Sequence, residues 1–170
     1  MRARLIRRRQ KGAALVEMAL TLGIFMVLLL AIFEFALLLF SWSRGVEATR
    51  AGARLAVVTD PVVDLAEIDA NDTPELSVNC GTSDCGAIAE RMMALLPEVQ
   101  PENITIAYRY SGVGHPERPA VIGLYEVTVR LSGVRRTLVM PGLLGLPLTV
   151  PMPPFSTTRI SEDLHTPQGP

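Results

Sequence analysis

Gly12, Ala13 and Glu17 are the residues of this chain whose types and spacing indicate chemistry. They follow a basic cluster, residues 7–11, and stand at the start of a long apolar run. If the chain is cut after Gly12, Ala13 gains a free amine, and Glu17 lies four residues on, about one helical turn away. In a low-dielectric setting that amine and a carboxylate, from one chain or from neighbouring subunits, would neutralise each other.

The apolar run that follows has the length of a membrane span. From Met18 to Phe33 no residue is charged, and from Met18 to Ser43 only Glu34 is. As a helix with a rise of about 1.5 Å per residue, the longer run reaches roughly 39 Å, which exceeds the ~30 Å of a hydrocarbon core. Residues 1–12 hold six Lys or Arg and no acid, so we expect a single span with its N-terminus in the cytoplasm.

Two other interpretations of this segment stay open. A cleaved secretory signal peptide shares the basic start, but its apolar core is only about 7 to 15 residues long, and the A-x-A match at 51–53 lies well beyond the apolar run. An ordinary uncleaved membrane anchor agrees with the length of the apolar run, but it gives Glu17 no structural or functional role. A charged residue at the centre of a membrane helix costs about 2.5 to 3.5 kcal/mol, and less near the cytoplasmic end, where Glu17 stands.

The residues around Gly12 resemble a known family. Gly12 followed by Ala-Ala-Leu-Val-Glu at 13–17 is similar to the site at which a prepilin peptidase cuts type IV pilin-related proteins. With Ile-Phe-Glu-Phe at 32–35 and Ala-Thr-Arg-Ala-Gly-Ala-Arg at 48–54, the stretch from residue 11 to about 58 resembles the TadE-like proteins. These are minor pseudopilins of the bacterial tight-adherence (Tad, or Flp) pilus. Met18 stands where the major Flp pilin has tyrosine, which favours a minor pseudopilin.

The resemblance implies a function in pilus assembly. It implies cleavage between Gly12 and Ala13, a role for Glu17 in processing and assembly, and an intramembrane contact at Glu34. The implied partners are a prepilin peptidase, the inner-membrane assembly platform and other pilins or pseudopilins. The implied location is the bacterial inner membrane, with the C-terminal domain in the periplasm. The alternatives are a type II secretion pseudopilin, and an uncleaved anchor that carries a periplasmic binding or envelope-sensing domain.

Composition argues against nucleic-acid binding and against an enzyme. The net charge of -1 hides an asymmetry, because residues 13–170 carry 10 basic against 17 acidic side chains, a net of -7. No phosphate loop or zinc motif is present. Ser156, Asp163 and His165 stand close together, but in a polar tail and without the glycines of a nucleophile elbow. We therefore expect no catalytic residue, no metal, no cofactor and no small-molecule substrate.

The rest of the chain predicts an α+β fold of pilin type. The membrane helix, 13–43, is expected to continue through an extension, 44–58, that ends before Asp60-Pro61. Gly45 and Gly52 either weaken this helix, by about 1 kcal/mol each relative to alanine, or mark points of close helix packing. Beyond it we expect an acidic linker at 59–79, a small external α+β domain at 80–160 and a disordered tail at 161–170.

Within the external domain the pattern predicts one helix and a small antiparallel sheet. The helix has Asp84 as its N-cap and ends before Pro97. Residues 104–110 and 125–131 alternate as strands of a hairpin, and 155–160 adds an edge strand. The apolar stretch 138–155 contains five prolines, too many for a second membrane helix, and reads as an irregular loop, an extended edge or a contact surface.

Cys80 and Cys85 are the two cysteines of the chain. Outside the cytoplasm a close pair predicts a structural disulfide, and free thiols are the alternative. A structural zinc would need four ligands, and the two histidines lie far apart in the sequence. A calcium site from Asp64, Asp69, Asn71 and Asp72 has suitable oxygen ligands but not the EF-hand spacing, so a solvated loop is favoured.

Overall fold

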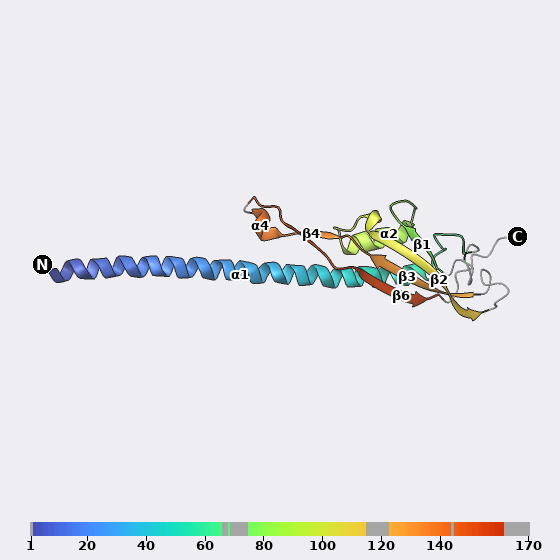
Figure 1. The fold of residues 1–170 in the computed structure, drawn as a ribbon, viewed down its shortest axis with the longest axis horizontal. Coiled ribbons are helices and arrows are strands. Elements are labelled where there is room, and N and C mark those ends of the chain that lie inside the picture. Colours follow the sequence, from blue (N-terminus) through green and yellow to red (C-terminus); the bar gives the residue numbers. More distant parts are fainter. Residues whose placement is uncertain (1, 66–67, 69–74, 115–122, 144, 162–170) are drawn as a thin grey trace. The chain divides into compact units, whose positions relative to one another are not determined.

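A computed structural model describes residues 2–65, 68, 75–114, 123–143 and 145–161 of the chain. A long N-terminal apolar helix is followed by a small antiparallel sheet, which confirms the predicted α+β class (Figure 1). The elements are α1 (Arg2–Ala56), β1 (Glu75–Asn79), α2 (Gly86–Leu95), the 3₁₀ helix η2 (Pro101–Asn103), β2 (Ile104–Gly114), β3 (Gly123–Leu131), β4 (Arg135–Thr137), α4 (Val139–Leu143), β5 (Thr149–Pro151) and β6 (Phe155–Ile160).

The chain divides into two units, each described separately below. The first contains Met1–Leu39 and Leu138–Leu148, and the second contains Phe40–Thr137 and Thr149–Pro170. Residues 2–39 of α1 therefore belong to the first unit and residues 40–56 to the second. The tail at 162–170, with Asp163 and His165, lies outside the described residues, as do His115 and three members of the considered calcium set, Asp69, Asn71 and Asp72.

The helix α1 is unbroken over 55 residues, from Arg2 to Ala56. It begins earlier than the predicted start at Ala13, because Arg, Leu, Gln and Lys are good helix formers and a single glycine costs only about 1 kcal/mol. It also ends two residues before the predicted Val58. There the N–H groups of Val58 and Thr59 both donate to the carbonyl of Leu55, at 3.1 and 3.0 Å, and close the last turn.

The larger of two sheets in the second unit has the strand order β1-β2-β3-β6, and β4 pairs with β5 in the other. Every neighbouring pair is antiparallel. The predicted hairpin is confirmed as β2 and β3, and the predicted edge strand as β6 (Figure 1). Alternate residues of β2 and β3 are buried in one core face: Ile104, Ile106, Tyr108, Tyr125, Val127, Val129 and Leu131.

The strand β1 lies within residues 59–79, the stretch that the sequence assigns to the acidic linker. The Glu75–Asn79 strand pairs with β2 over five residues, from Glu75 opposite Arg109 to Asn79 opposite Thr105. Only Leu76 and Val78 alternate in this short strand, too few residues for the period of two to show. Backbone pairing to a neighbouring strand, rather than the local pattern, forms β1.

The last turns of α1 pack on the sheet through small side chains. The buried residues of this segment are Ser41, Gly45, Ala48, Thr49, Ala51, Gly52, Ala53 and Ala56. A side chain built at Gly45 would place its Cβ 2.8 Å from the Phe155 ring, and one at Gly52 would place it 2.6 Å from the Met92 sulfur. The opposite face carries the exposed Glu47 and Arg54, which form an ion pair of 3.0 Å. Small residues thus let the helix backbone approach the core closely.

The helix α2 covers the core beside a disulfide between Cys80 and Cys85. Ile88, Met92 and Leu96 are buried, as the helical pattern predicts. The N-cap residue is Cys85 rather than the predicted Asp84, so the helix begins one residue later than expected. The Asp84 carboxylate still accepts the N–H of Gly86, at 2.8 Å.

Loss of the Cys80–Cys85 bond is expected to lower the free energy of unfolding by about 2 kcal/mol, since the closed loop is short. The measurement is denaturant unfolding of the full chain in detergent micelles, with Cys80→Ser/Cys85→Ser beside the parent. Reduced parent protein serves as the control and should unfold at the midpoint of the variant. A variant as stable as the oxidised parent would contradict this expectation.

Candidate functional site

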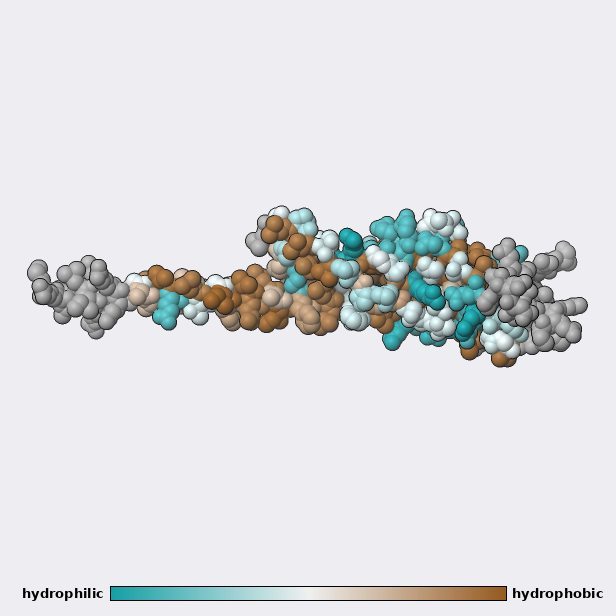
Figure 2. Space-filling view, in the orientation of Figure 1, coloured by the Kyte–Doolittle hydropathy of each residue, from teal (hydrophilic) through white to brown (hydrophobic). Residues whose placement is uncertain are grey.

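Most of the first unit is an apolar helix that is exposed over most of its length. Gly12–Ala56 is one helix long and apolar enough to cross a membrane, judged by length and composition. Figure 2 shows brown, apolar side chains over much of α1 and on the segment around α4. The large exposed side chains of this part of α1 are Leu15, Val16, Met18, Leu20, Leu22, Ile24, Phe25, Met26, Val27, Leu28, Leu29, Leu30, Ile32, Phe33, Phe35 and Leu39.

Gly12, Ala13 and Glu17 lie near the N-terminal end of this helix, and all three are exposed. Ala13 and Glu17 are one turn apart, so their side chains lie on the same face. The Glu17 carbonyl accepts the Thr21 hydroxyl at 2.7 Å. Among the described residues the Glu17 carboxylate has no hydrogen-bond or ion-pair partner. The structure thus places these three residues together on an exposed stretch of the helix.

Glu34 has a partner within its own unit. One carboxylate oxygen accepts the backbone N–H of Val139 at 2.9 Å, and the other accepts that of Met140 at 2.7 Å. Both donors lie at the start of α4, more than 100 residues further along the chain. The sequence suggested a contact for Glu34 but not which residues make it. Two features of the sequence could have indicated this contact. One is a lone acid within an apolar run, and the other is a second uncharged apolar stretch, at 138–148, for which the sequence predicted no single structure.

A shallow apolar groove lies beside this contact. Its lining comes from α1 (Val27, Leu30, Ala31 and Glu34) and from the α4 segment (Met140, Pro141, Leu146 and Leu148). A second groove lies on α1 alone and is lined by Ala19, Leu20, Gly23, Ile24, Val27, Leu28 and Ala31. Both are lined almost wholly by hydrocarbon, so they suit side chains or lipid rather than a polar substrate.

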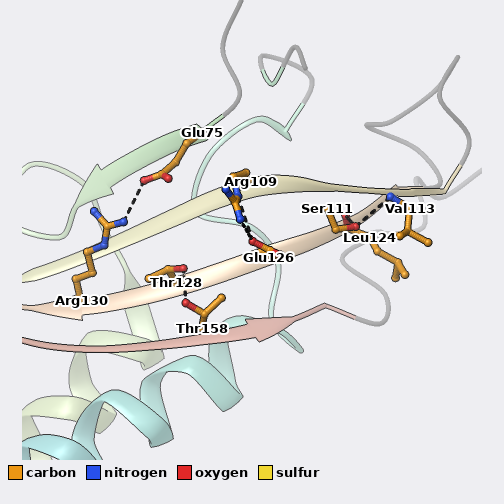
Figure 3. A network of polar contacts seen from close by, with 9 residues as sticks. All are labelled: Glu75, Arg109, Ser111, Val113, Leu124, Glu126, Thr128, Arg130 and Thr158. Atoms are coloured by element: carbon orange, nitrogen blue, oxygen red, sulfur yellow. Dashed lines mark hydrogen bonds and ion pairs between the residues drawn. The ribbon is translucent and has the colours of Figure 1, made fainter. Parts of the chain in front are cut away.

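The outer face of the sheet carries a network of polar contacts on β1, β2, β3 and β6 (Figure 3). Arg109 forms an ion pair with Glu126, and this bond raises the pKa of the guanidinium. Arg130 reaches Glu75 at 3.4 Å, and the hydroxyls of Thr128 and Thr158 lie 2.8 Å apart. Charges of both signs alternate on this face, so it offers no concentrated positive patch for a nucleic-acid backbone.

Buried polar groups in the second unit serve the fold. The Tyr108 hydroxyl accepts the N–H of Val62 at 3.3 Å, and its burial raises the pKa of this tyrosine. The Ser161 hydroxyl accepts the N–H of Tyr125 at 3.0 Å. Within the part of the chain that the structure describes, no cluster of three or more His, Cys, Asp or Glu residues is placed to hold a metal ion.

These features define a class: an α+β protein whose long N-terminal helix is suited to a membrane and which carries a small, disulfide-linked sheet domain. Residues 12–54 match the family model of TadE-like protein, which confirms the resemblance found in the sequence. This match links the segment to Tad pilus systems, whose TadE-like proteins are structural rather than enzymatic. It covers less than half of the chain and leaves the sheet outside. No curated protein and no solved structure matches the chain.

Proposed function

We propose that this protein is a minor pseudopilin that takes part in assembling the Tad (Flp) pilus, after a prepilin peptidase cuts it between Gly12 and Ala13. The observation that carries the proposal is the family match, which begins at Gly12 and runs to Arg54. The geometry supports it. Gly12 and Ala13 are exposed on the helix, and the exposed Glu17 lies one turn beyond the proposed new amine.

The proposed location is the bacterial inner membrane, with the leader in the cytoplasm and the sheet domain in the periplasm. The six basic residues of the leader favour cytoplasmic retention. The Cys80–Cys85 disulfide supports an oxidising compartment for the sheet domain. The two observations concern opposite ends of the span and agree on one orientation.

The proposed partners are the prepilin peptidase, other pilins or pseudopilins, and the inner-membrane assembly platform. The exposed helix supplies the contact surface, since Ala19 and Gly23, four residues apart, line its groove and small residues let membrane helices approach closely. The Glu17 carboxylate fixes the register by pairing with the Ala13 amine of a neighbouring subunit. Such a pair neutralises two charges that are each costly in hydrocarbon.

The test is the N-terminal residue and the mass of the protein isolated from its native membrane. We expect a chain that begins at Ala13. A chain that retains Met1 would overturn the processing step and leave an uncleaved anchor that carries an external domain. A cleaved chain that co-purifies with type II secretion components, and not with the Tad platform, would assign it to that other system.

A further inference from the structure

We infer that residues 138–148 form a second membrane-contacting element, a loop that inserts among the lipid acyl chains of the outer leaflet and is held there by Glu34. In this arrangement lipid covers the exposed apolar surface of the loop. The inference requires only that α1 spans a membrane. It stands whether or not the chain is cut at Gly12.

The depth of the loop follows from its contacts with α1. The loop residues Met140, Pro141, Leu146 and Leu148 line a groove with Val27, Leu30, Ala31 and Glu34. At a rise of about 1.5 Å per residue, Glu34 lies about 32 Å along the axis from Ala13, and Val27 about 21 Å. A hydrocarbon core is about 30 Å thick. The uncharged run before Glu34, from Met18 to Phe33, is only about 24 Å long as a helix. The span therefore needs residues 27–33, and the loop lies against its outer part.

The chemistry of the loop suits hydrocarbon. Its sequence, Leu-Val-Met-Pro-Gly-Leu-Leu-Gly-Leu-Pro-Leu, has no charged and no polar side chain. Several of its side chains remain open to the outside even with α1 alongside: Leu146 is 59% exposed and Leu148 is 54% exposed. Figure 2 shows brown side chains on this segment as well as on α1. An apolar surface continuous with that of a membrane helix is most simply covered by the same lipid.

Six backbone N–H groups of the loop have the hydrogen-bond partners that lipid requires. Irregular backbone at membrane depth is tolerated only where its polar groups find partners. Glu34 accepts the N–H groups of Val139 and Met140. Four more loop N–H groups donate to carbonyls of the loop itself: Leu138 to Leu148, Gly145 to Gly142, Leu146 to Pro141, and Leu148 to Leu146. Pro141 and Pro147 have no N–H to satisfy.

The Glu34 carboxylate gains from the same arrangement. An acid at this depth is costly unless it is paired or hydrogen-bonded. The two backbone donors, at 2.9 and 2.7 Å, engage both of its oxygens. The acid in the span and the uncharged loop, more than 100 residues apart in sequence, therefore stabilise each other. The loop donates hydrogen bonds to the carboxylate, and the carboxylate holds the loop against the helix.

The test is the depth of a nitroxide attached at Leu146→Cys in the full chain, reconstituted into vesicles of phosphatidylcholine and phosphatidylglycerol. The described cysteines form a disulfide, so the introduced thiol is the one that reacts. The collision rate of the nitroxide with dissolved oxygen is high in lipid, and its collision rate with a water-soluble nickel chelate is high in water. The ratio of the two rates therefore reports the depth of the label. Phe33→Cys on α1 is the membrane reference. Ile160→Cys is the matched water reference, since it is 58% exposed and pairs with Glu126 on the sheet.

We expect the oxygen-to-nickel collision ratio at residue 146 to match that at residue 33 and to exceed that at residue 160 about tenfold, because hydrocarbon excludes a polar chelate. A ratio equal to that at residue 160 would overturn the proposal. Protection from both reagents would also overturn it, because it would show that protein, such as a second copy, covers the loop.

A second pair of variants isolates the role of Glu34. Glu34→Leu removes the acceptor of two loop N–H groups, and Glu17→Leu is the matched control, an acid-to-leucine change on the same helix. We expect Glu34→Leu to lower the ratio of inserted to water-exposed loop about tenfold, from the loss of two charge-assisted hydrogen bonds, with no change for Glu17→Leu. An unchanged ratio in Glu34→Leu would refute the anchoring role.

Discussion

A Gly12→Leu variant is expected to stay uncut and to begin at Met1, while the parent protein begins at Ala13. Glycine has no Cβ, so the backbone on the leader side of the bond can approach the peptidase closely. A leucine at this position keeps that backbone away from the catalytic groups. Because the effect falls on a single bond, we expect cleavage to be lost altogether. Mass spectrometry of the protein purified from native membranes reads the outcome directly.

The structure supplies a matched control for this experiment in Gly23. A Cβ added at Gly12 or at Gly23 meets no described atom within 4 Å, so the first carbon of a leucine finds open space at either position. Both glycines are exposed on α1, and only Gly12 adjoins the proposed cut. Gly23→Leu is therefore expected to be processed normally, even if it packs poorly against a neighbouring subunit. Normal cleavage of Gly12→Leu would contradict the assigned site.

The local patterns of the sequence predicted the elements whose pattern is strong. The uncharged run after Met18 predicted a membrane-length helix, and alternation in residues 104–110 and 125–131 predicted β2 and β3. The buried face of α2, with Ile88 and Met92, followed from the helical period. In each case a local feature, either the length of an uncharged run or the periodicity of side chains, carried enough information by itself.

What the sequence did not predict depends on contacts between distant residues. β1 is too short for a period of two to be visible, and it forms because β2 offers it backbone partners. The donors to Glu34, Val139 and Met140, lie beyond the whole sheet domain in sequence, and no local pattern pairs a carboxylate with so distant a backbone. At the proposed site Gly12 and Glu17 are exposed on the helix, while cleavage itself is a property of an encounter with another protein.

Gly52→Leu is expected to lower the free energy of unfolding by about 3 kcal/mol and the Tm by about 10 °C or more. A Cβ at this buried position would lie 2.6 Å from the sulfur and 3.0 Å from the Cγ of Met92, and 3.4 Å from a methyl carbon of Val129. Met92 and Val129 are fully buried, so they have little room to withdraw from the further carbons of a leucine. The measurement is thermal and denaturant unfolding of the full chain in detergent micelles.

Arg50→Leu is the control for that experiment, because it introduces the same side chain on the same helix at an exposed position. We expect it to change stability by less than about 0.5 kcal/mol. A difference between the two variants assigns the cost to packing at Gly52 rather than to an added leucine. If both unfold at one midpoint, α1 does not approach α2 and β3 as closely as the buried small residues indicate. The expected difference would explain why a glycine occupies position 52 of the matched segment 12–54. Glycine lets the sheet domain pack against the last turns of the helix, and a larger residue would prevent that packing.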